Sequence, residues 1–451
     1  MIYPIQPIKV SDILYATSGE LVSGEADMTV SAISCDSRTA TKDTLFIPLK
    51  GEKFDAHMFI EDVCKTGIKG YLFSGDIPVF DAPFAIKVKD TLKALSDIAS
   101  YYRSLFDIPF VALTGSVGKT TTKELVASVL SSRYNTHFTK GNFNNNIGVP
   151  FTLFGLTKMH ETAVIEMGMS NFGEIELLSL TTRPDIAIIT NIGTSHIEFL
   201  GSQEGILKAK SEIFKGLKKG GKVILNGDDP YLLSLKDKLK DFCVYYVGIN
   251  NIDADYVATD ITGDETGCTF KVKDKTYTIN LAGVHNVYNA LCAIVCGEIL
   301  GLDYSHISDG LARYHADGIR QNIISTNGYK VINDCYNSSP QSVVAALKVL
   351  TDVRADRKIA VLGDIAELGK MSEELHRGVG KAINDFKIDI LVTVGKDSLY
   401  IADEVSDKEK YAFPDSEKAS EFLKDFVSKG DAVLVKGSRC MKMEKISQML
   451  I

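Results

Sequence analysis

The sequence contains no long uninterrupted apolar run and no segment of low complexity. Nothing approaches the roughly 18 consecutive apolar residues of a membrane-spanning helix, so we expect no membrane insertion. The N-terminal segment MIYPIQPIKVSDILYATSGE lacks a basic stretch followed by an apolar one, and it therefore predicts no signal peptide. No internal repeat recurs at the periods of solenoid proteins. The chain is therefore expected to form ordinary globular domains.

Acidic residues outnumber basic ones in the sequence, by 58 to 50. The formal net charge is -8, which disfavours non-specific binding to nucleic acid or to an anionic membrane, because both require a cationic surface. A local basic pocket is still compatible with this charge. The eight cysteines are scattered, and only Cys292 and Cys296 lie one helical turn apart. Since a metal site or disulfide framework would call for a second pair, we expect buried, reduced thiols in a cytoplasmic protein. We also expect the protein to be a monomer.

The length and composition indicate a multidomain α/β protein. The chain has 451 residues, of which 45% are hydrophobic and 24% charged, and about 100 to 200 residues per domain is usual. We predict a small N-terminal α/β domain at 1–107, a central doubly wound sheet domain with a phosphate loop at 108–315, and a C-terminal Rossmann-like domain at 316–451.

Apolar runs along the sequence support this division. In the first domain, short runs separated by Gly, Asp and Pro predict strands, and residues 91–106 have an amphipathic helical pattern. From about residue 110, runs of consecutive apolar residues alternate with helical patterns, as in parallel strands covered on both faces. The predicted central strands are 110–115, 162–168, 185–193 and 222–229, with helices at 204–217 and 286–302 and a β-rich patch at 268–281. The predicted C-terminal strands are 329–337, 358–364, 389–395 and 431–438.

The segment VALTGSVGKTTTKE, at 111–124, joins the first central strand to a helix. Gly115 and Gly118 would let the backbone approach an anion, and the helix N-terminus would supply a positive field. Lys119 would reach the terminal phosphates, and the Thr120 hydroxyl would bind Mg²⁺. Leu113 stands where the common phosphate-loop pattern has its first glycine, so the match is to a shorter variant. A tight turn with a capping threonine is the structural alternative, but the combined pattern favours a nucleoside triphosphate, with Ser116 and Thr121 as further candidate contacts.

Three more residues are candidates for completing a metal site. Glu166 ends a predicted parallel strand, where a carboxylate can coordinate Mg²⁺ beside the phosphates. His196 follows another strand, and Lys210 lies on the next helix. Each has a structural alternative: a helix cap for Glu166, a packed polar side chain for His196 and a solvated helix residue for Lys210. They gain significance as a set that follows the phosphate loop in sequence.

The chain resembles the Mur ligases, the ATP-dependent amino-acid ligases of peptidoglycan precursor synthesis. The matching segments span all three predicted domains. They are CDSR and FIPLKGEKFDAHMFI in the first domain; TGSVGKTTTKE, GNFNNNIGVP, EMGMSNFGEI, NIGTSHIEFLGS, AKSEIF and GVHNVYNALCAI in the second; and DCYNSSP, VLGDIAELG and VKGSR in the third. Within the family, GNFNNNIGVP and LGDIAELG point to the member that adds a D-alanyl-D-alanine dipeptide.

The resemblance assigns candidate roles to residues. It implies that Lys119 and Thr120 bind ATP and Mg²⁺, that Glu166 and His196 hold a second magnesium ion, and that Lys210 is carbamylated. Further nucleotide contacts are implied for Asn286, Asn289, Arg320, Asp334, Tyr336 and Asn337. Ser37 and Arg38 would meet the uridine diphosphate of the other substrate, and Asn142 and Asn145 would line its path. For Ser37 and Arg38, a surface turn with a salt bridge is the alternative.

The implied activity is an ATP-dependent ligation through an acyl phosphate. Its substrates would be a UDP-N-acetylmuramoyl tripeptide and D-alanyl-D-alanine, with ATP, two Mg²⁺ ions and the carbamylated lysine as cofactors. One rival is a folylpolyglutamate synthetase relative, although the CDSR-bearing domain argues for a UDP substrate. The other is a phosphate-loop switch or transport ATPase, which would leave Glu166, His196 and Lys210 unexplained.

Overall fold

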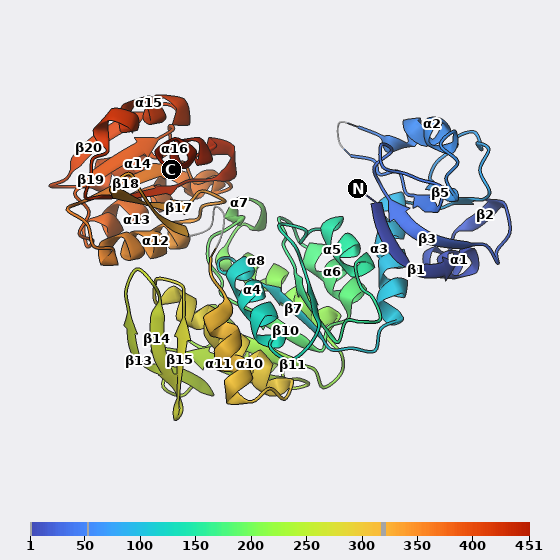
Figure 1. The fold of residues 1–451 in the computed structure, drawn as a ribbon, viewed down its shortest axis with the longest axis horizontal. Helices are drawn as coiled ribbons and strands as arrows, with labels where there is room; N and C mark the ends of the chain where they lie inside the picture. The colour runs from blue at the N-terminus through green and yellow to red at the C-terminus, as the bar shows by residue number, and fades with distance from the viewer. Residues whose placement is uncertain (1, 52–53, 317–321) are drawn as a thin grey trace. The chain divides into compact units, whose positions relative to one another are not determined.

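The computed structural model describes residues 2–51, 54–316 and 322–451. Its strands form three sheets, of six, nine and six strands, with helices packed around them (Figure 1). This mixed α/β architecture with three sheets confirms the predicted fold class. The domain boundaries at 107/108 and 315/316 stay predictions.

The first sheet has the strand order β1-β3-β4-β5-β6-β2. Strands β3, β4, β5 and β6 are parallel to one another, while β1 pairs antiparallel with β3 and β2 pairs antiparallel with β6 at the two edges. The elements are β1 (Ile2–Lys9), α1 (Val10–Thr17), β2 (Glu20–Ser23), β3 (Thr29–Ser34), β4 (Thr44–Phe46), α2 (Ile60–Cys64), β5 (Gly70–Phe73), β6 (Ala85–Lys87) and α3 (Thr91–Ser104). Prolines at positions 4 and 7 hide β1 in the sequence; they are tolerated because β1 is an edge strand with a register shift between Pro4 and Ile8.

The second sheet has the order β15-β14-β13-β12-β11-β10-β7-β9-β8. Its strands are β7 (Phe110–Thr114), β8 (Thr136–Phe138), β9 (Thr162–Glu166), β10 (Ile186–Ile189), β11 (Lys222–Asn226), β12 (Cys243–Gly248), β13 (Tyr256–Gly263), β14 (Cys268–Val272) and β15 (Lys275–Ile279). The helices are α4 (Lys119–Leu130), α5 (Gly148–Phe154), α6 (Glu174–Thr182), α7 (Ile197–Leu200), α8 (Gln203–Ser211), α9 (Pro230–Leu233), α10 (His285–Ile299) and α11 (Tyr304–Arg313). The four predicted apolar runs form β7, β9, β10 and β11.

One predicted helix is shorter than expected. The pattern at 204–217 predicts a continuous helix, but α8 ends at Ser211 and a 3₁₀ turn, Glu212–Lys215, follows. The Glu212 carboxylate accepts hydrogen bonds from the backbone N–H groups of Gly173 and Glu176, at the start of α6. This tertiary contact, which no local pattern encodes, fixes the turn.

The third sheet has the order β16-β17-β21-β18-β19-β20, and all its strands except β16 are parallel. The strands are β16 (Asn322–Thr326), β17 (Tyr329–Asp334), β18 (Arg357–Gly363), β19 (Ile390–Val394), β20 (Glu409–Phe413) and β21 (Asp431–Lys436). The helices are α12 (Pro340–Asp352), α13 (Ser372–Ile383), α14 (Leu399–Glu404), α15 (Ser416–Phe426) and α16 (Glu444–Leu450). The four predicted strands form its centre, with side chains such as Val331, Ile359 and Val433 fully buried.

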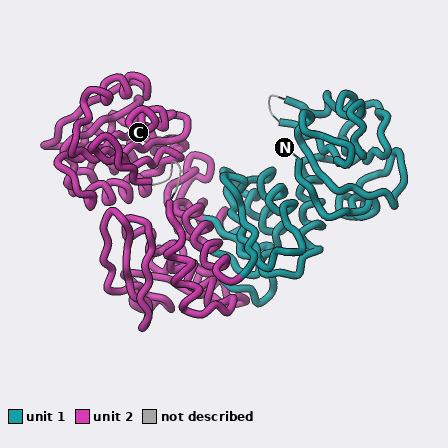
Figure 2. The backbone as a smooth tube through the Cα atoms, in the orientation of Figure 1, with its two compact units in different colours: residues 1–114, 134–188, 211–222 teal, residues 115–133, 189–210, 223–451 magenta. Residues whose placement is uncertain are grey.

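Two compact units emerge from the packing of the chain (Figure 2). The first comprises residues 1–114, 134–188 and 211–222, and the second comprises residues 115–133, 189–210 and 223–451. The second unit therefore contains the phosphate-loop segment, the segment bearing His196 and Lys210, and the third sheet. Among the described helices, none is both long enough and apolar enough to cross a membrane.

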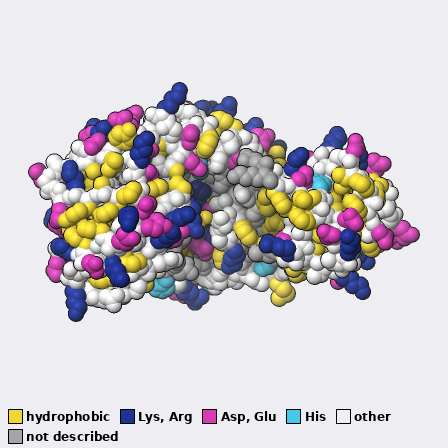
Figure 3. All heavy atoms as spheres, turned by 90° about the horizontal axis from the view of Figure 1, so that it is seen from above, with side chains coloured by type: hydrophobic (Ala, Val, Ile, Leu, Met, Phe, Trp, Pro, Cys, Tyr) yellow, Lys and Arg dark blue, Asp and Glu magenta, His cyan; other side chains and the backbone are white. Residues whose placement is uncertain are grey.

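The surface carries side chains of both charges, and the cysteines form no disulfide bonds. On the face seen in Figure 3, lysine and arginine side chains are interspersed with acidic ones. All eight cysteines are free thiols. The prediction that they are buried is wrong for Cys243 and Cys440, which are exposed, and holds only in part for Cys35 and Cys64, which are partly buried. Cys243 is the first residue of β12, and Cys440 lies within a 3₁₀ turn, Arg439–Met441.

Candidate functional site

The segment after β7 forms a tight loop in which two glycines are sterically required. A Cβ atom on Gly115 would lie 1.8 Å from Thr190 Oγ1, and one on Gly118 would lie 2.7 Å from Asn289 Oδ1. Gly118 also has a φ of +85°, which favours glycine, and is the residue from which α4 starts. The glycines that the sequence singled out therefore serve the turn itself as well as any approach by an anion.

The end of β10 holds this loop in place. Asn191 binds Val117 twice, accepting from its N–H at 2.9 Å and donating to its carbonyl at 2.9 Å. The Thr190 hydroxyl donates to the same carbonyl at 2.6 Å. Ser116 is bound through its backbone N–H to the Asn191 carbonyl at 3.0 Å and through its hydroxyl to the Gly193 N–H at 2.9 Å. The hydrogen bonds of residues 190–193 thus fix the conformation of the loop.

Lys119 begins α4 and curls back over the loop. Its ammonium donates to the Gly115 carbonyl at 2.8 Å, and it is only partly buried. Thr120 and Thr121 follow in the first turn of α4 and are also partly buried. The helix N-terminus and the lysine concentrate positive charge at the end of this loop, which suits a phosphate group.

Lys210, near the end of α8, is almost entirely buried, with 1% of its surface exposed. Burial, assisted by repulsion from Lys119, lowers the pKa of the Lys210 amine well below 10.5. Lys119, which contributes to this shift in pKa, belongs to the phosphate-loop segment, and the role of Lys210 at a metal site stays a prediction. The alternative of a solvated helix lysine does not hold.

Glu166 ends β9 in the first unit and is 1% exposed. One of its oxygens, Oε1, accepts a hydrogen bond from Asn144 Nδ2 at 2.8 Å, and its backbone N–H donates to Thr139 Oγ1 at 3.0 Å. The other oxygen, Oε2, is buried without a hydrogen-bond partner. A buried carboxylate oxygen is costly to leave unsatisfied, so this position fits a cation. Sequence reasoning picked the neighbours of Asn144 and overlooked Asn144 itself.

His196 is the residue from which α7 starts, in a left-handed conformation with a φ of +63°. Its Nδ1 lies 2.5 Å from Glu367 Oε2. Glu367 also has a left-handed backbone, with a φ of +61°, and the hydrogen bond to His196 lowers the pKa of its carboxyl. In the described residues, no group of three or more His, Cys, Asp and Glu side chains converges on one point. A metal site here would need the lysine and threonine ligands that the resemblance implies.

Asn286 and Asn289 are both buried in α10. The Asn289 amide oxygen accepts from the Thr122 hydroxyl at 3.0 Å, and its amide nitrogen donates to Asn286 Oδ1 at 3.0 Å. Asn286 in turn donates to the Ala282 carbonyl at 2.8 Å. The pair therefore connects α10 to the phosphate-loop helix, and the nucleotide contacts implied for the two residues stay a prediction.

The C-terminal candidates lie where β17 ends. Asp334 binds Lys436, which is 2% exposed, at 2.6 Å, and Lys436 also donates to the Asn337 carbonyl at 3.1 Å. Tyr336 is partly buried and Asn337 is exposed. Arg320 lies outside the described residues. Lys436 was not singled out in the sequence, although it sits in the matching segment VKGSR.

The candidates for the UDP substrate are more exposed. Arg38, which is 86% exposed, forms a fork to both carboxylate oxygens of Asp36 at 2.9 Å, and Ser37 lies between them. The alternative of a surface turn with a salt bridge therefore describes this geometry. Asn142 and Asn145 are exposed before α5, and Asn145 Oδ1 accepts from the Gly148 N–H at 2.8 Å, as a helix cap does. Their substrate contacts stay predictions.

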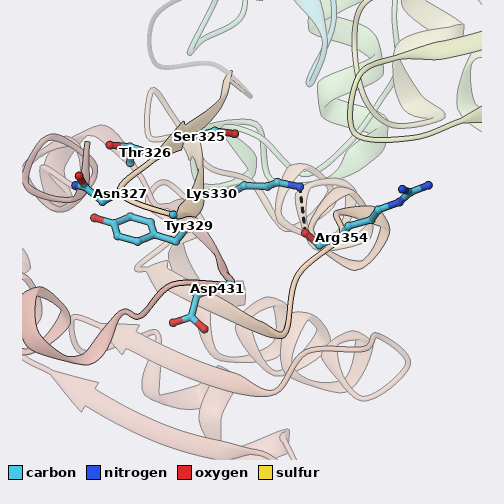
Figure 4. Close-up of a pocket in the computed structure, with 9 residues that line it drawn as sticks. Ser325, Thr326, Asn327, Tyr329, Lys330, Arg354 and Asp431 are labelled. Carbon is cyan, nitrogen blue, oxygen red and sulfur yellow. Dashed lines mark hydrogen bonds between the residues drawn. The ribbon is translucent and has the colours of Figure 1, made fainter.

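Two cavities lie at opposite ends of the third sheet. One, of about 280 Å³, is at the carboxyl ends of β17, β18 and β21 and is lined by segments 337–339, 366–368 and 438–440 together with Ser195 and His196. The other, of about 380 Å³, is at their amino ends. There Lys330 points to the Arg354 carbonyl (Figure 4) and forms an ion pair with Glu265 at 2.6 Å.

Family models match most of the chain. A model described as the Mur ligase middle domain matches residues 113–297. A second, described as the Mur ligase glutamate ligase domain, matches residues 319–439. The first match includes the phosphate loop, and the second includes the strands of the third sheet.

Curated relatives match over nearly the whole chain. The UDP-N-acetylmuramoyl-tripeptide--D-alanyl-D-alanine ligase of Bacillus subtilis is 39% identical, with 98% of each chain covered. The ligase of the same name from Escherichia coli is 37% identical, with 98% of this chain and 97% of that protein covered.

Solved structures agree. A crystal structure of MurF from Acinetobacter baumannii has a TM-score of 0.93 at 32% identity and covers 99% of this chain and 100% of that one. MurF ligase from Thermotoga maritima in complex with ADP has a TM-score of 0.83 at 26% identity, with 92% of this chain and 96% of that one covered. The sequence matches and the structural matches together show that the chain belongs to the Mur ligase family.

Proposed function

We propose that this chain joins D-alanyl-D-alanine to a UDP-N-acetylmuramoyl tripeptide at the expense of ATP, a step of peptidoglycan precursor synthesis. The observation that carries the proposal is the 39% identity to the Bacillus subtilis ligase over 98% of both chains. The phosphate loop supports it, because the reaction needs a site for the triphosphate of ATP.

The reaction has two steps. The terminal carboxylate of the tripeptide attacks the γ-phosphorus of ATP, which forms an acyl phosphate and releases ADP. The amine of D-alanyl-D-alanine then attacks the acyl carbon, loses a proton and displaces phosphate, so that an amide is formed. Two anions must approach each other in the first step. Lys119 and the N-terminus of α4 offset this repulsion and stabilise the charge of the transferred group.

Magnesium fits the chemistry of the candidate ligands. Thr120 would hold one ion beside the phosphates, Glu166 and His196 would hold a second, and the unsatisfied Glu166 Oε2 supports a cation at that carboxylate. When bound, magnesium neutralises phosphate charge and orients the reacting oxygens. Asn144 holds the other oxygen of Glu166 and so fixes the direction in which the free oxygen points.

Lys210 is suited to carbamylation. A carbamate forms when a neutral amine attacks carbon dioxide and releases a proton, and the lowered pKa of Lys210 favours the neutral form of its amine. The product carries a negative charge and two oxygens, which would make Lys210 a ligand for magnesium. The charge reversal would also remove the repulsion between Lys210 and Lys119.

An acyl phosphate is easily lost to water. We propose that the third predicted domain closes over the nucleotide, excludes solvent and brings the amine into line, with 1–107 holding the UDP group. Fixed geometry of this kind contributes several kcal/mol, up to about 7–11 kcal/mol in well-oriented reactions. The chain is proposed to act as a cytoplasmic monomer.

The test is product formation from defined substrates. MgATP, UDP-N-acetylmuramoyl tripeptide and D-alanyl-D-alanine are mixed, the mass of the product is read, and phosphate release is followed with each substrate omitted in turn. We expect the mass of a UDP-N-acetylmuramoyl pentapeptide, and no steady phosphate release when either peptide substrate is missing. Phosphate release that ignores both omissions, without a condensed product, would contradict the proposal. Tripeptides ending in lysine or diaminopimelate should be compared.

A further inference from the structure

Asp229 is a buried carboxylate outside the phosphate loop and outside the candidate metal ligands. It lies just after β11 in the second unit and is 8% exposed. Its Oδ1 accepts hydrogen bonds from the backbone N–H groups of Tyr231 at 2.9 Å and Leu232 at 3.1 Å, and so caps the short helix α9. Its Oδ2 accepts from the backbone N–H of Ile192 at 2.7 Å. One oxygen therefore serves the local helix, and the other binds a segment that is distant in the sequence.

The helix cap alone does not explain why this residue is an aspartate. Asn and Ser cap helices about as well as Asp does, and neither carries the cost of a buried charge. Burial raises the pKa of the Asp229 carboxyl, in opposition to its three backbone hydrogen bonds. Donors that approach from two sides need two acceptor oxygens, which a carboxylate provides, whereas an amide would present its NH₂ group to one of them. The contact with Ile192 therefore accounts for the carboxylate.

Ile192 belongs to the clamp, residues 190–193, that holds the phosphate loop. Its neighbours in the clamp form hydrogen bonds with the loop. The backbone of Ile192 is bound by other parts of the unit: its N–H donates to Asp229, and its carbonyl accepts from Gln203 Nε2 at 3.1 Å. Asp229 and Gln203 therefore hold the clamp from behind, while the clamp holds the loop.

These contacts close into a ring of hydrogen bonds. Gln203 is the first residue of α8, and its Oε1 accepts from the Tyr231 hydroxyl at 3.3 Å. The Tyr231 N–H binds Asp229. The ring therefore passes from Asp229 to Ile192, Gln203 and Tyr231 and returns to Asp229. It connects the segments that follow β10 and β11 with the start of α8.

Helix α8 is the element that carries Lys210. Lys210 lies about two helical turns after Gln203, so the two side chains project from the same face of the helix. Repulsion from Lys119 contributes to the lowered pKa of Lys210, which places the lysine within electrostatic reach of the phosphate-loop segment. The ring thus joins the clamp of the loop to the helix that bears the proposed carbamate.

We propose that Asp229 is a positioning residue, which acts through Ile192 and Gln203 to hold the phosphate loop and helix α8 at a fixed separation. The proposal rests on the ligase activity proposed above and adds a residue that acts through its neighbours. Transfer of a phosphoryl group depends on the placement of the charges around it. A shift of α8 relative to the loop therefore slows the first step even when the nucleotide still binds. Loss of the ring lowers kcat more than it raises the KM for ATP.

The first test compares Asp229→Asn, Gln203→Met and Tyr231→Phe. Asp229→Asn keeps one oxygen to cap α9 but presents an NH₂ group to the Ile192 N–H. We expect the kcat for acyl phosphate formation, measured by trapping with hydroxylamine, to fall about 10–100-fold, with little change in the KM for ATP. Gln203→Met breaks two neutral hydrogen bonds and Tyr231→Phe breaks the longest one, so the losses should decrease in that order. Asp303→Asn, which changes the capping carboxylate of α11, is the matched control and should keep the wild-type kcat.

The second test separates positioning from a general loss of stability. Asp229→Asn is introduced into the wild type and into Lys210→Met, and ligation rates are compared well below the unfolding midpoints of all four proteins. If Asp229 acts by placing α8, its substitution should cost little more in Lys210→Met, because the group that the helix presents is already gone. Equal proportional losses in both backgrounds, or no loss in either, would overturn the proposal. If Asp229→Asn does not fold, Gln203→Met replaces it in the same comparison.

The third test needs no turnover. Hydrogen exchange, read by peptide mass, should be several-fold faster at 189–196 in Asp229→Asn than in the wild type, and unchanged in β12 of the same unit. Unchanged exchange at 189–196 would show that Asp229 does not hold the clamp and would overturn the proposal, whether or not the protein ligates. If the wild type makes neither trapped hydroxamate nor pentapeptide, the proposed function itself fails, and the exchange result still decides whether the ring holds the clamp.

Discussion

The phosphate loop and the turn that carries Arg38 are both short polar segments after a parallel strand, yet they differ in how the protein holds them. The loop is clamped by residues 190–193, and its glycines have no room for a side chain. The Arg38 side chain is 86% exposed and binds a neighbour two positions away in the sequence. The conformation of the phosphate loop is therefore fixed by residues far away in the sequence, whereas that of the Arg38 turn is fixed by contacts within the turn.

The two segments differ in how far their geometry supports a role in binding. In the loop, the shape that the fold imposes is already suited to a phosphate, so geometry supports the role. In the turn, the salt bridge satisfies Arg38 without any ligand, and a substrate would have to compete with Asp36 for the guanidinium. Substitutions in the loop should consequently affect folding and activity together, while those in the turn should affect substrate binding alone.

The largest effect is expected for Gly115→Ala. The new Cβ would lie 1.8 Å from Thr190 Oγ1, so the loop must move, and we expect a loss of kcat/KM for ATP of at least about 10²-fold. Steady-state kinetics and thermal unfolding measure both consequences. Thr190→Ala in the same chain removes the clashing oxygen and should restore part of the stability. Gly301→Ala, also at a positive φ but with open space around it, should leave the activity intact; an equal loss there would refute the steric explanation.

Lys210→Met should reduce ligation by roughly 10²–10³-fold, because it removes the charged group proposed to hold magnesium. Binding of ATP without magnesium, measured by calorimetry, should change little. Lys208→Met, two residues away on α8, is the control. Ligation by the Lys210→Met protein at the wild-type rate would exclude the carbamate.

The same variant tests the burial of Lys210 through the dependence of stability on pH. A lysine whose pKa is lowered in the folded state binds fewer protons there than in the unfolded state, so the free energy of unfolding rises with pH up to about 10.5. In buffer free of carbon dioxide, Lys210→Met should therefore be more stable than the wild type at neutral pH. This advantage should shrink as the pH approaches 10.5, as measured by denaturant unfolding. A difference that is constant with pH would contradict the lowered pKa of the Lys210 amine.

A smaller effect is expected for Asn144→Ala. The change frees Glu166 Oε1 from its hydrogen bond, and loss of a partner that orients a metal ligand costs about 10–100-fold. The loss should be seen in the magnesium concentration needed for half-maximal ligation. Asn135→Ala, at the residue directly before β8, is the control. An unchanged magnesium requirement would show that Asn144 does not orient a metal ligand.

Arg38→Met should give the smallest effect. The KM for the UDP substrate is expected to rise about 10-fold through the loss of a charge-assisted contact with diphosphate, with kcat and the unfolding midpoint unchanged. Lys65→Met, which breaks another exposed ion pair of the first sheet's unit, should change none of these values. If Arg38→Met behaves like Lys65→Met, the turn is a surface salt bridge and nothing more.

The sequence predicted those parts of the fold whose signal is local. Consecutive apolar residues identified β7, β9, β10 and β11, and the glycines and lysine of the loop identified its shape. The prolines of β1 concealed an edge strand, and the early end of α8 depends on Glu212 binding to α6. These features arise from tertiary pairing, which a pattern along one segment cannot carry.

The candidate site was predicted to a similar extent. Lys210 proved to be buried, as a functional lysine on a helix would be, although its carbamylation rests on the resemblance alone. Asn144, Lys436 and Glu367 were missed because each acts through a partner that is far away in the sequence. Asn286 and Asn289 were selected, and they proved to hold two helices together. Their buried amides show how a motif residue can serve the scaffold that surrounds a ligand.

The double hydrogen bond from Asn191 to Val117 has a thermodynamic consequence. The backbone N–H and carbonyl of Val117 are already hydrogen-bonded to Asn191. The loop therefore loses little conformational entropy when a nucleotide binds. Association should therefore carry a small entropic penalty and proceed without a slow rearrangement. Asn191→Ala would convert a rigid receptor into one that must be ordered by its ligand.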